Sequence, residues 1–429
     1  MNGIPESAAA EWRRYWPVVL TGFFGMSFAA VPMQSVAFFI DPVRAEFGWS
    51  RTEVTIGASV FGLVSLLAPF AGAIQDALGP RRLAIGGVTL CIAALVSLSF
   101  ATGSLGLWIG QWTFFALAEL FIKATLWLAV VNRVFVHAKG MAIALVLCGT
   151  FMAQTLTPLL AYYLIEQFGW RPAYSLIGIG WGGSTLLLVL LFFHEQRGAG
   201  RGPSAIAKPG ETPPSQLTGL TIRQALRCLA LYRIAIALTL YTALSLAVVT
   251  HKVSILGEMG MSRGQAALIA AAAGISAIAG QLGTGWLFDR SRSTWIGVSA
   301  FALAAMGFVL LLEPVRSPGL IVTAMILFGV SSGAVLQATM YLTAQYCGQR
   351  NFGKIFGAKS CLFSIGLGGG PLLGAAIVDG FGSYNPLFVL AVPVSVLCSL
   401  LVFRLGPCPD WQEPAPAPGI SSAASAAAA

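Results

Sequence analysis

Three ionisable residues, Glu119, Lys123 and Lys359, lie within apolar stretches of this 429-residue sequence. Because 57% of the residues are hydrophobic and only 10% are charged, a charge inside such a stretch demands an explanation. A charged side chain at the centre of a bilayer costs about 2.5 to 3.5 kcal/mol on insertion scales. We therefore expect all three side chains to face a protein interior or a water-filled cavity.

Glu119 and Lys123 are four residues apart, which places them on one face of a helix and within reach of an ion pair. Gln111 leads into that face and Trp127 follows it. Polar and aromatic groups on one helix face are suited to binding a solute. The two charges could instead form a closed structural pair that fixes helix packing, and the sequence leaves both interpretations open.

The charge balance of these residues favours an anion. Two Lys and one Glu leave a shared cavity with one net positive charge, which suits a carboxylate. Lys123 lies in the first half of the sequence and Lys359 in the second, so the two could hold the substrate together and couple its binding to a closure of the halves. Lys359 lies close to one end of its stretch, so snorkelling of its ammonium group to the membrane surface is an equal alternative.

Other polar residues in the apolar stretches are weaker candidates. Gln34, Gln154 and Gln281 could line the cavity or form hydrogen bonds between helices. His251 and Lys252 come at the end of an apolar stretch, and we expect them at the membrane surface rather than in the site.

Glu119 is also the candidate proton carrier. Moving an anion into a cell against an interior-negative potential costs about 2.3 kcal/mol per 100 mV, so uptake needs a co-transported cation or an exchanged anion. A carboxylate beside a Lys in a partly dry cavity can change protonation as the site opens. The pattern favours proton symport and leaves anion exchange as an alternative.

These residues must be positioned by helices that cross a membrane. The apolar stretches are continuous and lack the alternation of outer-membrane strands, which predicts an all-α integral membrane protein. Twelve transmembrane helices of about 20 residues each fit the chain. This count requires a break in the stretch from Leu83 to Ala118, and the small residues Thr102-Gly103-Ser104 indicate a turn there.

The sequence repeats itself at offsets of 212 and 213 residues. Glu46-Phe47-Gly48-Trp49-Ser50-Arg51 corresponds to Glu258-Met259-Gly260-Met261-Ser262-Arg263, and Pro158 and Phe168-Gly169 correspond to Pro371 and Phe381-Gly382. We therefore predict two six-helix pseudo-repeats. The predicted organisation is a cytoplasmic N-terminus (1–15), an N-terminal bundle (16–194), a cytoplasmic linker (195–233), a C-terminal bundle (234–404) and a disordered cytoplasmic tail (405–429).

The distribution of basic residues predicts the orientation. Placing both termini in the cytoplasm assigns most of the 25 Lys and Arg residues to the cytoplasmic side, and this bias accounts for the net charge of +9. We expect a multi-pass protein of a bacterial-type cytoplasmic membrane, surrounded by lipid and monomeric. No soluble face offers a basic patch for nucleic acid. Three His and seven Cys show no metal-binding spacing, so we expect neither metal nor cofactor.

The loop after the second predicted helix carries a recognisable motif. It contains Gly72, Asp76, Gly79, Arg81 and Arg82, and it resembles the Gly-x-x-x-Asp-(basic)-x-Gly-x-(basic)-(basic) signature of the major facilitator superfamily, with Ala77 in place of the usual basic residue. Gly285, Asp289 and Arg290 repeat part of the motif in the second half. The resemblance implies that the Asp and Arg residues form a cytoplasmic gate, closed by contacts that exist in one state only. A merely positive cytoplasmic turn is the alternative.

Within this superfamily, the sequence is similar to the monocarboxylate and oxalate/formate transporter branches. The similarity rests on Phe47 to Arg51, Gly79 to Arg82, Phe168 to Arg171 and Lys359. It implies that Lys359 contacts a dicarboxylate, as a Lys of helix eleven does in the oxalate/formate branch. The Arg that assists it in helix eight has no counterpart here, where Gln281 stands instead. The charges of helices one and eight in the monocarboxylate branch are absent as well.

Together these features predict a secondary active transporter, not an enzyme. Its substrate would be a small organic anion, a mono- or dicarboxylate or an aromatic acid, moved by alternating access with proton symport. An anion/anion antiporter and an exporter of amphipathic compounds are alternatives. A membrane enzyme is disfavoured because His137, His194 and His251 fall near the ends of spans and no nucleophile with a base accompanies them. A sensor would need a signalling domain, and no phosphate-binding loop for an ATPase is present.

Overall fold

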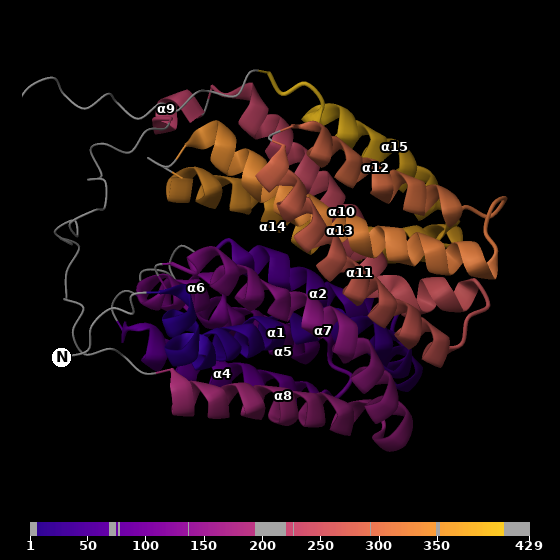
Figure 1. The fold of residues 1–429 in the computed structure, drawn as a ribbon. Helices are drawn as coiled ribbons and strands as arrows, with labels where there is room; N and C mark the ends of the chain where they lie inside the picture. The colour runs from indigo at the N-terminus through magenta and orange to yellow at the C-terminus, as the bar shows by residue number, and fades with distance from the viewer. Residues whose placement is uncertain are drawn as a thin grey trace, which may run out of the picture.

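The computed structural model describes residues 7–67, 74–75, 78–135, 137–193, 220–225, 227–291, 293–348 and 352–406. These residues are nearly all helical and gather in two bundles, one above the other in Figure 1. The N-terminal bundle contains α1 (Ala8–Phe47), α2 (Arg51–Ser65), α4 (Pro80–Leu98), α5 (Leu105–Glu119), the short 3-10 helix η1 (Leu120–Ile122), α6 (Ala124–Val134), α7 (Lys139–Phe168) and α8 (Trp170–Phe192). The C-terminal bundle contains α9 (Ile222–Ala225), α10 (Leu229–Glu258), α11 (Arg263–Arg290), α12 (Trp295–Leu310), α13 (Pro318–Cys347), α14 (Phe352–Phe381) and α15 (Asn385–Val402).

The helices confirm the predicted class of membrane protein. Within the described residues, ten helical segments are long and apolar enough to cross a bilayer, and α12 is a shorter apolar helix. With α2, these segments are consistent with the twelve predicted crossings. The turn predicted at Thr102-Gly103-Ser104 separates α4 from α5, where Gly103 has a φ of 81° and the hydroxyl of Ser104 caps α5.

Each bundle has its own apolar core. Phe28, Trp108 and Trp112 are fully buried in the N-terminal bundle. Phe301 and Phe388 are buried in the C-terminal bundle. Large apolar side chains such as Leu187 and Leu191 remain exposed on the outside, as expected for helices that face lipid tails.

The sequence repeat folds into matching turns. Gly48 and Gly260 end α1 and α10 with φ values of 71° and 82°, which a residue without a Cβ adopts freely. The following helices, α2 and α11, both begin with a capping box, built by Ser50 with Glu53 and by Ser262 with Gln265. The offset of 212 residues therefore describes real structural equivalence. The domain boundaries remain a prediction, and most of the linker and tail lie outside the described residues.

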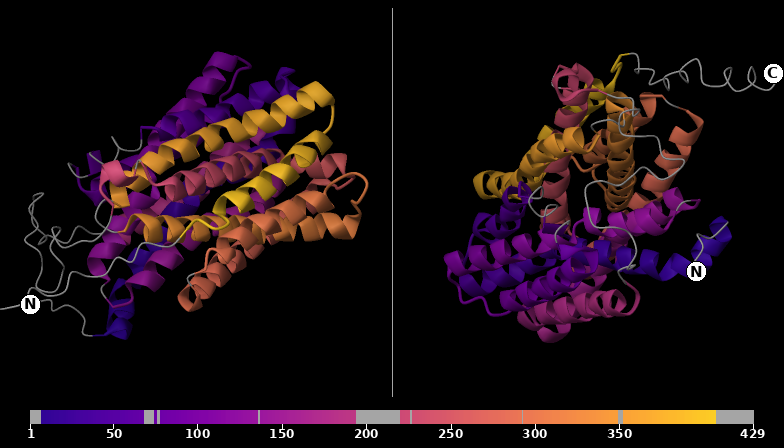
Figure 2. Two further views of the ribbon diagram at one scale, coloured as in Figure 1. Left: turned by 90° about the horizontal axis from the view of Figure 1, so that it is seen from above. Right: turned by 90° about the vertical axis from the view of Figure 1, so that its left-hand side faces the viewer.

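The same equivalence extends to two carboxylates that fasten neighbouring turns. Glu46 accepts hydrogen bonds from the indole of Trp170 (2.7 Å) and from Arg171. Its counterpart Glu258 accepts them from the Ser383 hydroxyl (2.6 Å) and the Tyr384 backbone N–H (3.0 Å). These contacts lie at one end of the molecule, built by the turns at 48–50, 99–104, 169, 259–262, 311–317 and 382–384, which we call the distal face. It lies opposite the end at which α1 begins and α15 ends, and Figure 2 shows the bundles from two further sides.

Candidate functional site

A buried lysine lies between the two bundles. Lys252 of α10 is only 4% exposed, and its Nζ donates a hydrogen bond to the main-chain oxygen of Gln34 in α1, 3.1 Å away. Our expectation that Lys252 lies at the membrane surface is wrong. The charge of Lys252 indicates the end of a span, but α10 continues to Glu258, so Lys252 lies about 9 Å inside the end of the helix.

His251 was also expected at the surface, and it is fully buried. Its Nε2–H donates to the carbonyl of Pro371 (3.0 Å), and its Nδ1 accepts from the hydroxyl of Tyr384 (3.0 Å). A carbonyl can only accept, so these two bonds fix the tautomer of the ring. Gly374 makes room for the imidazole, because a Cβ there would lie 2.6 Å from His251 Cδ2. His251 thus ties α10 to α14 and α15 within the C-terminal bundle.

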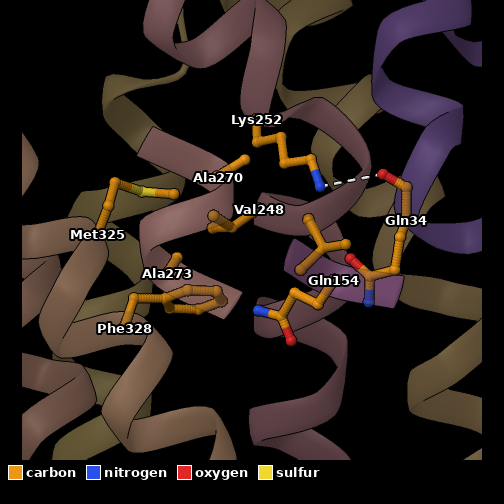
Figure 3. A pocket seen from close by; sticks show the side chains of 9 residues that line it. Gln34, Gln154, Val248, Lys252, Ala270, Ala273, Met325 and Phe328 are labelled. Carbon is orange, nitrogen blue, oxygen red and sulfur yellow. Dashed lines mark hydrogen bonds between the residues drawn. The ribbon is translucent and has the colours of Figure 1, made fainter. Parts of the chain in front are cut away.

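Lys252 faces a small cavity between the bundles (Figure 3). It is lined by residues from α1, α7, α10, α11 and α13: Gln34, Gln154, Val248, Val249, Lys252, Ala270, Ala273, Met325 and Phe328. The cavity has a volume of about 10 Å³, which is the room that one water molecule needs. Within the described part of the chain, no carboxylate forms an ion pair with Lys252. The cavity therefore contains the amine of Lys252 with no paired carboxylate from the described residues, and two amide side chains lie beside it.

Glu119 and Lys123 form the predicted ion pair, with 2.9 Å between Oε2 and Nζ. The predicted geometry of a single helix face is wrong, however. The α-helix ends at Glu119, η1 follows, and Lys123 has an extended backbone that begins α6. Nζ of Lys123 also lies 3.4 Å from the hydroxyl of Ser65 and 5.7 Å from the ring centre of Phe61, both in α2. This pair lies at a break in the fourth crossing, apart from the Lys252 cavity.

Two other predicted site residues pack inside the N-terminal bundle. The amide of Gln111 donates to the carbonyl of Ser97 in α4. Trp127 is fully buried, and its indole donates to the carbonyl of Ile122 at 2.7 Å. Its ring fills the space left by Gly25 of α1. Both side chains therefore lie inside the N-terminal bundle and not at the Lys252 cavity, and their contact with a solute stays a prediction.

The remaining predicted residues stay apart from the Lys252 cavity or are only partly described. Gln281 is buried where α11 passes Gly333 of α13 and does not line the cavity. The backbone of Lys359 lies in α14, but its side chain is outside the described part of the protein. Gln34 and Gln154, in contrast, are brought together with Lys252, although Gln34 contributes its carbonyl oxygen to the observed bond.

The predicted cytoplasmic gate is only partly visible. Gly72, Asp76 and the side chain of Asp289 are outside the described residues. Gly79 has a φ of 80° and caps the start of α4, Arg81 donates to the carbonyl of Leu190 (3.1 Å), and Arg82 is exposed. A Cβ added at Gly285 would lie 3.6 Å from Nε2 of Gln337, and the guanidinium carbon of Arg290 lies 3.7 Å from the ring centre of Trp286. The gate therefore stays a prediction.

The sequence repeat contains a signal for the position of Lys252. The offsets of 212 and 213 map Lys252 onto Ile40 and Phe39, two fully enclosed residues in the interior of α1. A residue equivalent to these positions is expected in the interior of its span and not at the end. The repeat was therefore a better guide to the depth of Lys252 than its charge.

Comparisons with known proteins agree with this architecture. A family model described as Major Facilitator Superfamily matches residues 20–358 and 234–428. Monocarboxylate transporter 13 of Bos taurus is 28% identical over 390 residues, which cover 88% of this chain and 85% of the relative. Multidrug resistance protein MdtG of Dickeya zeae is 25% identical over 411 residues, covering 91% and 94%.

The fold also occurs among solved structures. The crystal structure of a bacterial homologue of the human lysosomal transporter Spinster, in an inward-facing and unoccupied conformation, superposes with a TM-score of 0.62. The two sequences are 14% identical, and the match covers 90% of this chain and 94% of the other. At this identity the similarity concerns the fold alone.

Proposed function

The chain belongs to the major facilitator superfamily, and we propose that this transporter moves a small organic anion across the membrane by alternating access between its two bundles. The substrate would be a mono- or dicarboxylate or an aromatic acid. The observation that carries this proposal is Lys252, a buried cation between the bundles whose observed partner is one backbone carbonyl. A membrane-buried charge without a counter-charge is well suited to an anionic ligand.

The groups around Lys252 support a carboxylate with an apolar body. The side-chain amide of Gln154 can donate to a carboxylate oxygen beside the ammonium group. Met325 and Phe328 line the opposite part of the cavity and offer apolar contact (Figure 3). A few polar groups in a mostly apolar lining are typical of small-molecule sites.

The small cavity volume fits alternating access. About 10 Å³ is too little for any organic acid, so the bundles must separate before a substrate can reach Lys252. An arriving carboxylate would replace the Gln34 carbonyl as the partner of Lys252. Binding would thereby release one contact that joins the bundles in the observed state.

Two features bear on coupling and direction. Glu119, paired with Lys123 at the break of the fourth crossing, remains our proposed proton carrier for symport. Exchange of one anion for another is the alternative. Export of amphipathic compounds is a second candidate function, favoured by the similarity to a relative named as a multidrug resistance protein.

We also propose the membrane setting inferred from the charge bias. Both termini would lie in the cytoplasm of a bacterial-type cell, the protein would be a monomer in the cytoplasmic membrane, and the distal face would be extracytoplasmic.

The test is uptake by proteoliposomes of a panel of labelled organic acids and labelled amphipathic cations, with and without an imposed proton gradient. We expect accumulation of at least one organic acid, a loss of more than tenfold in Lys252→Met, and partial retention in Lys252→Arg, which preserves the charge. Accumulation that is unchanged in Lys252→Met would contradict the anion site. Transport confined to amphipathic cations in the same vesicles would favour the exporter.

A further inference from the structure

The two bundles touch most closely at two equivalent helix crossings. In the first, α2 passes α14 so closely that a Cβ on Gly62 would lie 2.2 Å from the backbone nitrogen of Gly368. In the second, α11 passes α7, and a Cβ on Gly274 would lie 2.7 Å from the backbone nitrogen of Thr155. Gly62 and Gly274 are related by the offset of 212, and Thr155 and Gly368 by that of 213. The two crossings are therefore equivalent under the sequence repeat.

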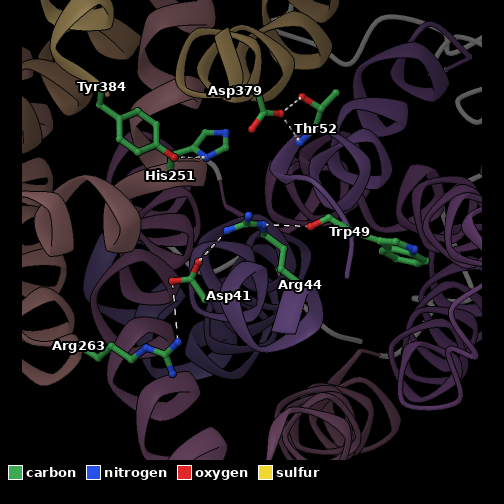
Figure 4. Close-up of polar contacts among 8 residues, drawn as sticks. All are labelled: Asp41, Arg44, Trp49, Thr52, His251, Arg263, Asp379 and Tyr384. Carbon is green, nitrogen blue, oxygen red and sulfur yellow. Dashed lines mark hydrogen bonds and ion pairs between the residues drawn. The ribbon is translucent and has the colours of Figure 1, made fainter. Parts of the chain in front are cut away.

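Each of these helix pairs is also joined at its distal end. In the first pair, the carboxylate of Asp379 in α14 accepts hydrogen bonds from the backbone N–H (3.2 Å) and the hydroxyl (2.6 Å) of Thr52 in α2 (Figure 4). In the second pair, Nη1 of Arg263 in α11 lies 3.8 Å from the carboxylate of Glu166 in α7. Nη2 of the same Arg lies 3.8 Å from the carboxylate of Asp41 in α1.

The repeat relates these two joints as well. Asp379 and Glu166 are 213 positions apart, and each is a carboxylate near the end of its helix. Thr52 and Arg263 both belong to the first turn of the equivalent helices α2 and α11. In both pairs, the carboxylate of one bundle therefore holds the helix start of the other.

Each joint lies far enough from its crossing that a rotation at the crossing would separate the joined groups. Ten or eleven residues separate each joint from its crossing, which corresponds to about 15 Å along a helix. A small rotation at the close glycine contacts produces a larger separation at the distal ends. The distal side can therefore open only if both joints break.

We propose that Thr52–Asp379 and Glu166–Arg263–Asp41 are two latches of unequal strength that keep the distal side closed. This inference goes beyond the proposed function, because it holds for any transported solute. The side chains of the Arg263 latch are 32% to 47% exposed and meet as ion pairs, so salt screens them. Asp379 is exposed too, but it accepts two direct hydrogen bonds from neutral donors at the start of α2 and needs no second charge, so salt weakens the Thr52 latch less than it weakens an ion pair.

Opening is measured by the reaction of a thiol-specific reagent with Ser254→Cys, in the full-length protein in lipid nanodiscs. Ser254 is 8% exposed and lines a cavity of about 360 Å³ together with Asp41 and Arg263. Labelling at position 254 is read by peptide mass spectrometry. We expect Asp379→Ala to raise its rate at least fivefold and Thr52→Val, which removes only the hydroxyl donor, to raise it less.

The second latch is tested with Arg263→Met, which preserves much of the side-chain length. We expect the labelling rate at position 254 to rise about twofold at low salt. At about 1 M salt, where the Debye length is near 3 Å, we expect the same rate as in the parent. The matched control is Arg316→Met, which removes a distal Arg whose ion-pair partner, Glu313, belongs to the same bundle. It should label at the parental rate.

The fully buried Cys91 separates opening from misfolding, because only unfolding exposes this core thiol. Faster labelling at position 254, while Cys91 stays unlabelled, supports the latches. Parental rates in Asp379→Ala, Thr52→Val and Arg263→Met would overturn the proposal, and so would an equal rise in Arg316→Met. If Asp379→Ala unfolds the protein and exposes Cys91, the labelling rate at position 254 in Thr52→Val tests the first latch instead.

Discussion

The ammonium group of Lys252 lies 3.1 Å from the main-chain oxygen of Gln34, so a cation of one bundle is held by the backbone of the other. A single carbonyl is a poor substitute for water around a charged group in a membrane. The arrangement therefore stores an unfavourable energy in the closed protein. A substrate carboxylate would relieve it.

Replacing Lys252 by Met should stabilise the protein, because the change removes a buried charge and preserves the apolar stem. We expect the free energy of unfolding to rise by up to about 3 kcal/mol, the insertion cost of such a charge. The measurement is the melting temperature in detergent, compared with Arg290→Met, whose guanidinium is exposed above Trp286. A lower melting temperature in Lys252→Met would mean that the lysine is a structural group.

Gly25 and Trp127 should be energetically coupled. A Cβ on Gly25 would lie 2.2 Å from the Trp127 ring, so Gly25→Ala should cost about 1 to 3 kcal/mol by overpacking. Trp127→Ala should cost about 3 to 5 kcal/mol, and the double variant less than the sum of both. Melting of the four proteins tests this coupling. Gly110→Ala, with open space around the new Cβ inside α5, should not lower the melting temperature, and additive losses in the double variant would refute the contact.

Glu119→Gln should separate proton coupling from substrate movement. The amide can still accept a contact from Lys123 but cannot release a proton at physiological pH. We expect proteoliposomes to lose accumulation driven by a proton gradient while they retain counterflow exchange of the substrate. Loss of both activities, or of neither, would remove Glu119 from the coupling role.

The equivalent carboxylates Glu46 and Glu258 should both contribute to stability. Replacing Glu258 by Ala leaves the Tyr384 N–H without its acceptor. Replacing Glu46 by Ala leaves the indole N–H of Trp170 without its acceptor. Each loss should cost about 1 to 2 kcal/mol. Glu313→Ala, which removes only an exposed ion pair with Arg316, should change the melting temperature little. Equal melting of all three variants would contradict this role.

The sequence by itself was sufficient for features that depend on neighbouring residues. Continuous apolar stretches predict membrane helices, because any helix in lipid must satisfy its backbone internally. The small residues at 102–104 indicated the turn between α4 and α5. The repeat around Ser50 and Ser262 predicted equivalent turns, and the spacing of Glu119 and Lys123 predicted their ion pair.

Only the tertiary structure decided which side chains face the space between the bundles. Membrane helices are apolar on most sides, so their pattern does not indicate how each helix is rotated about its axis. Trp127 therefore turned out to fill its own bundle, while Lys252, whose charge resembled the end of a helix, lies between the bundles. Asp379 and Thr52 are more than 300 residues apart and meet because α14 crosses α2. Local patterns determined the helices and turns, and the packing of one bundle against the other determined the site.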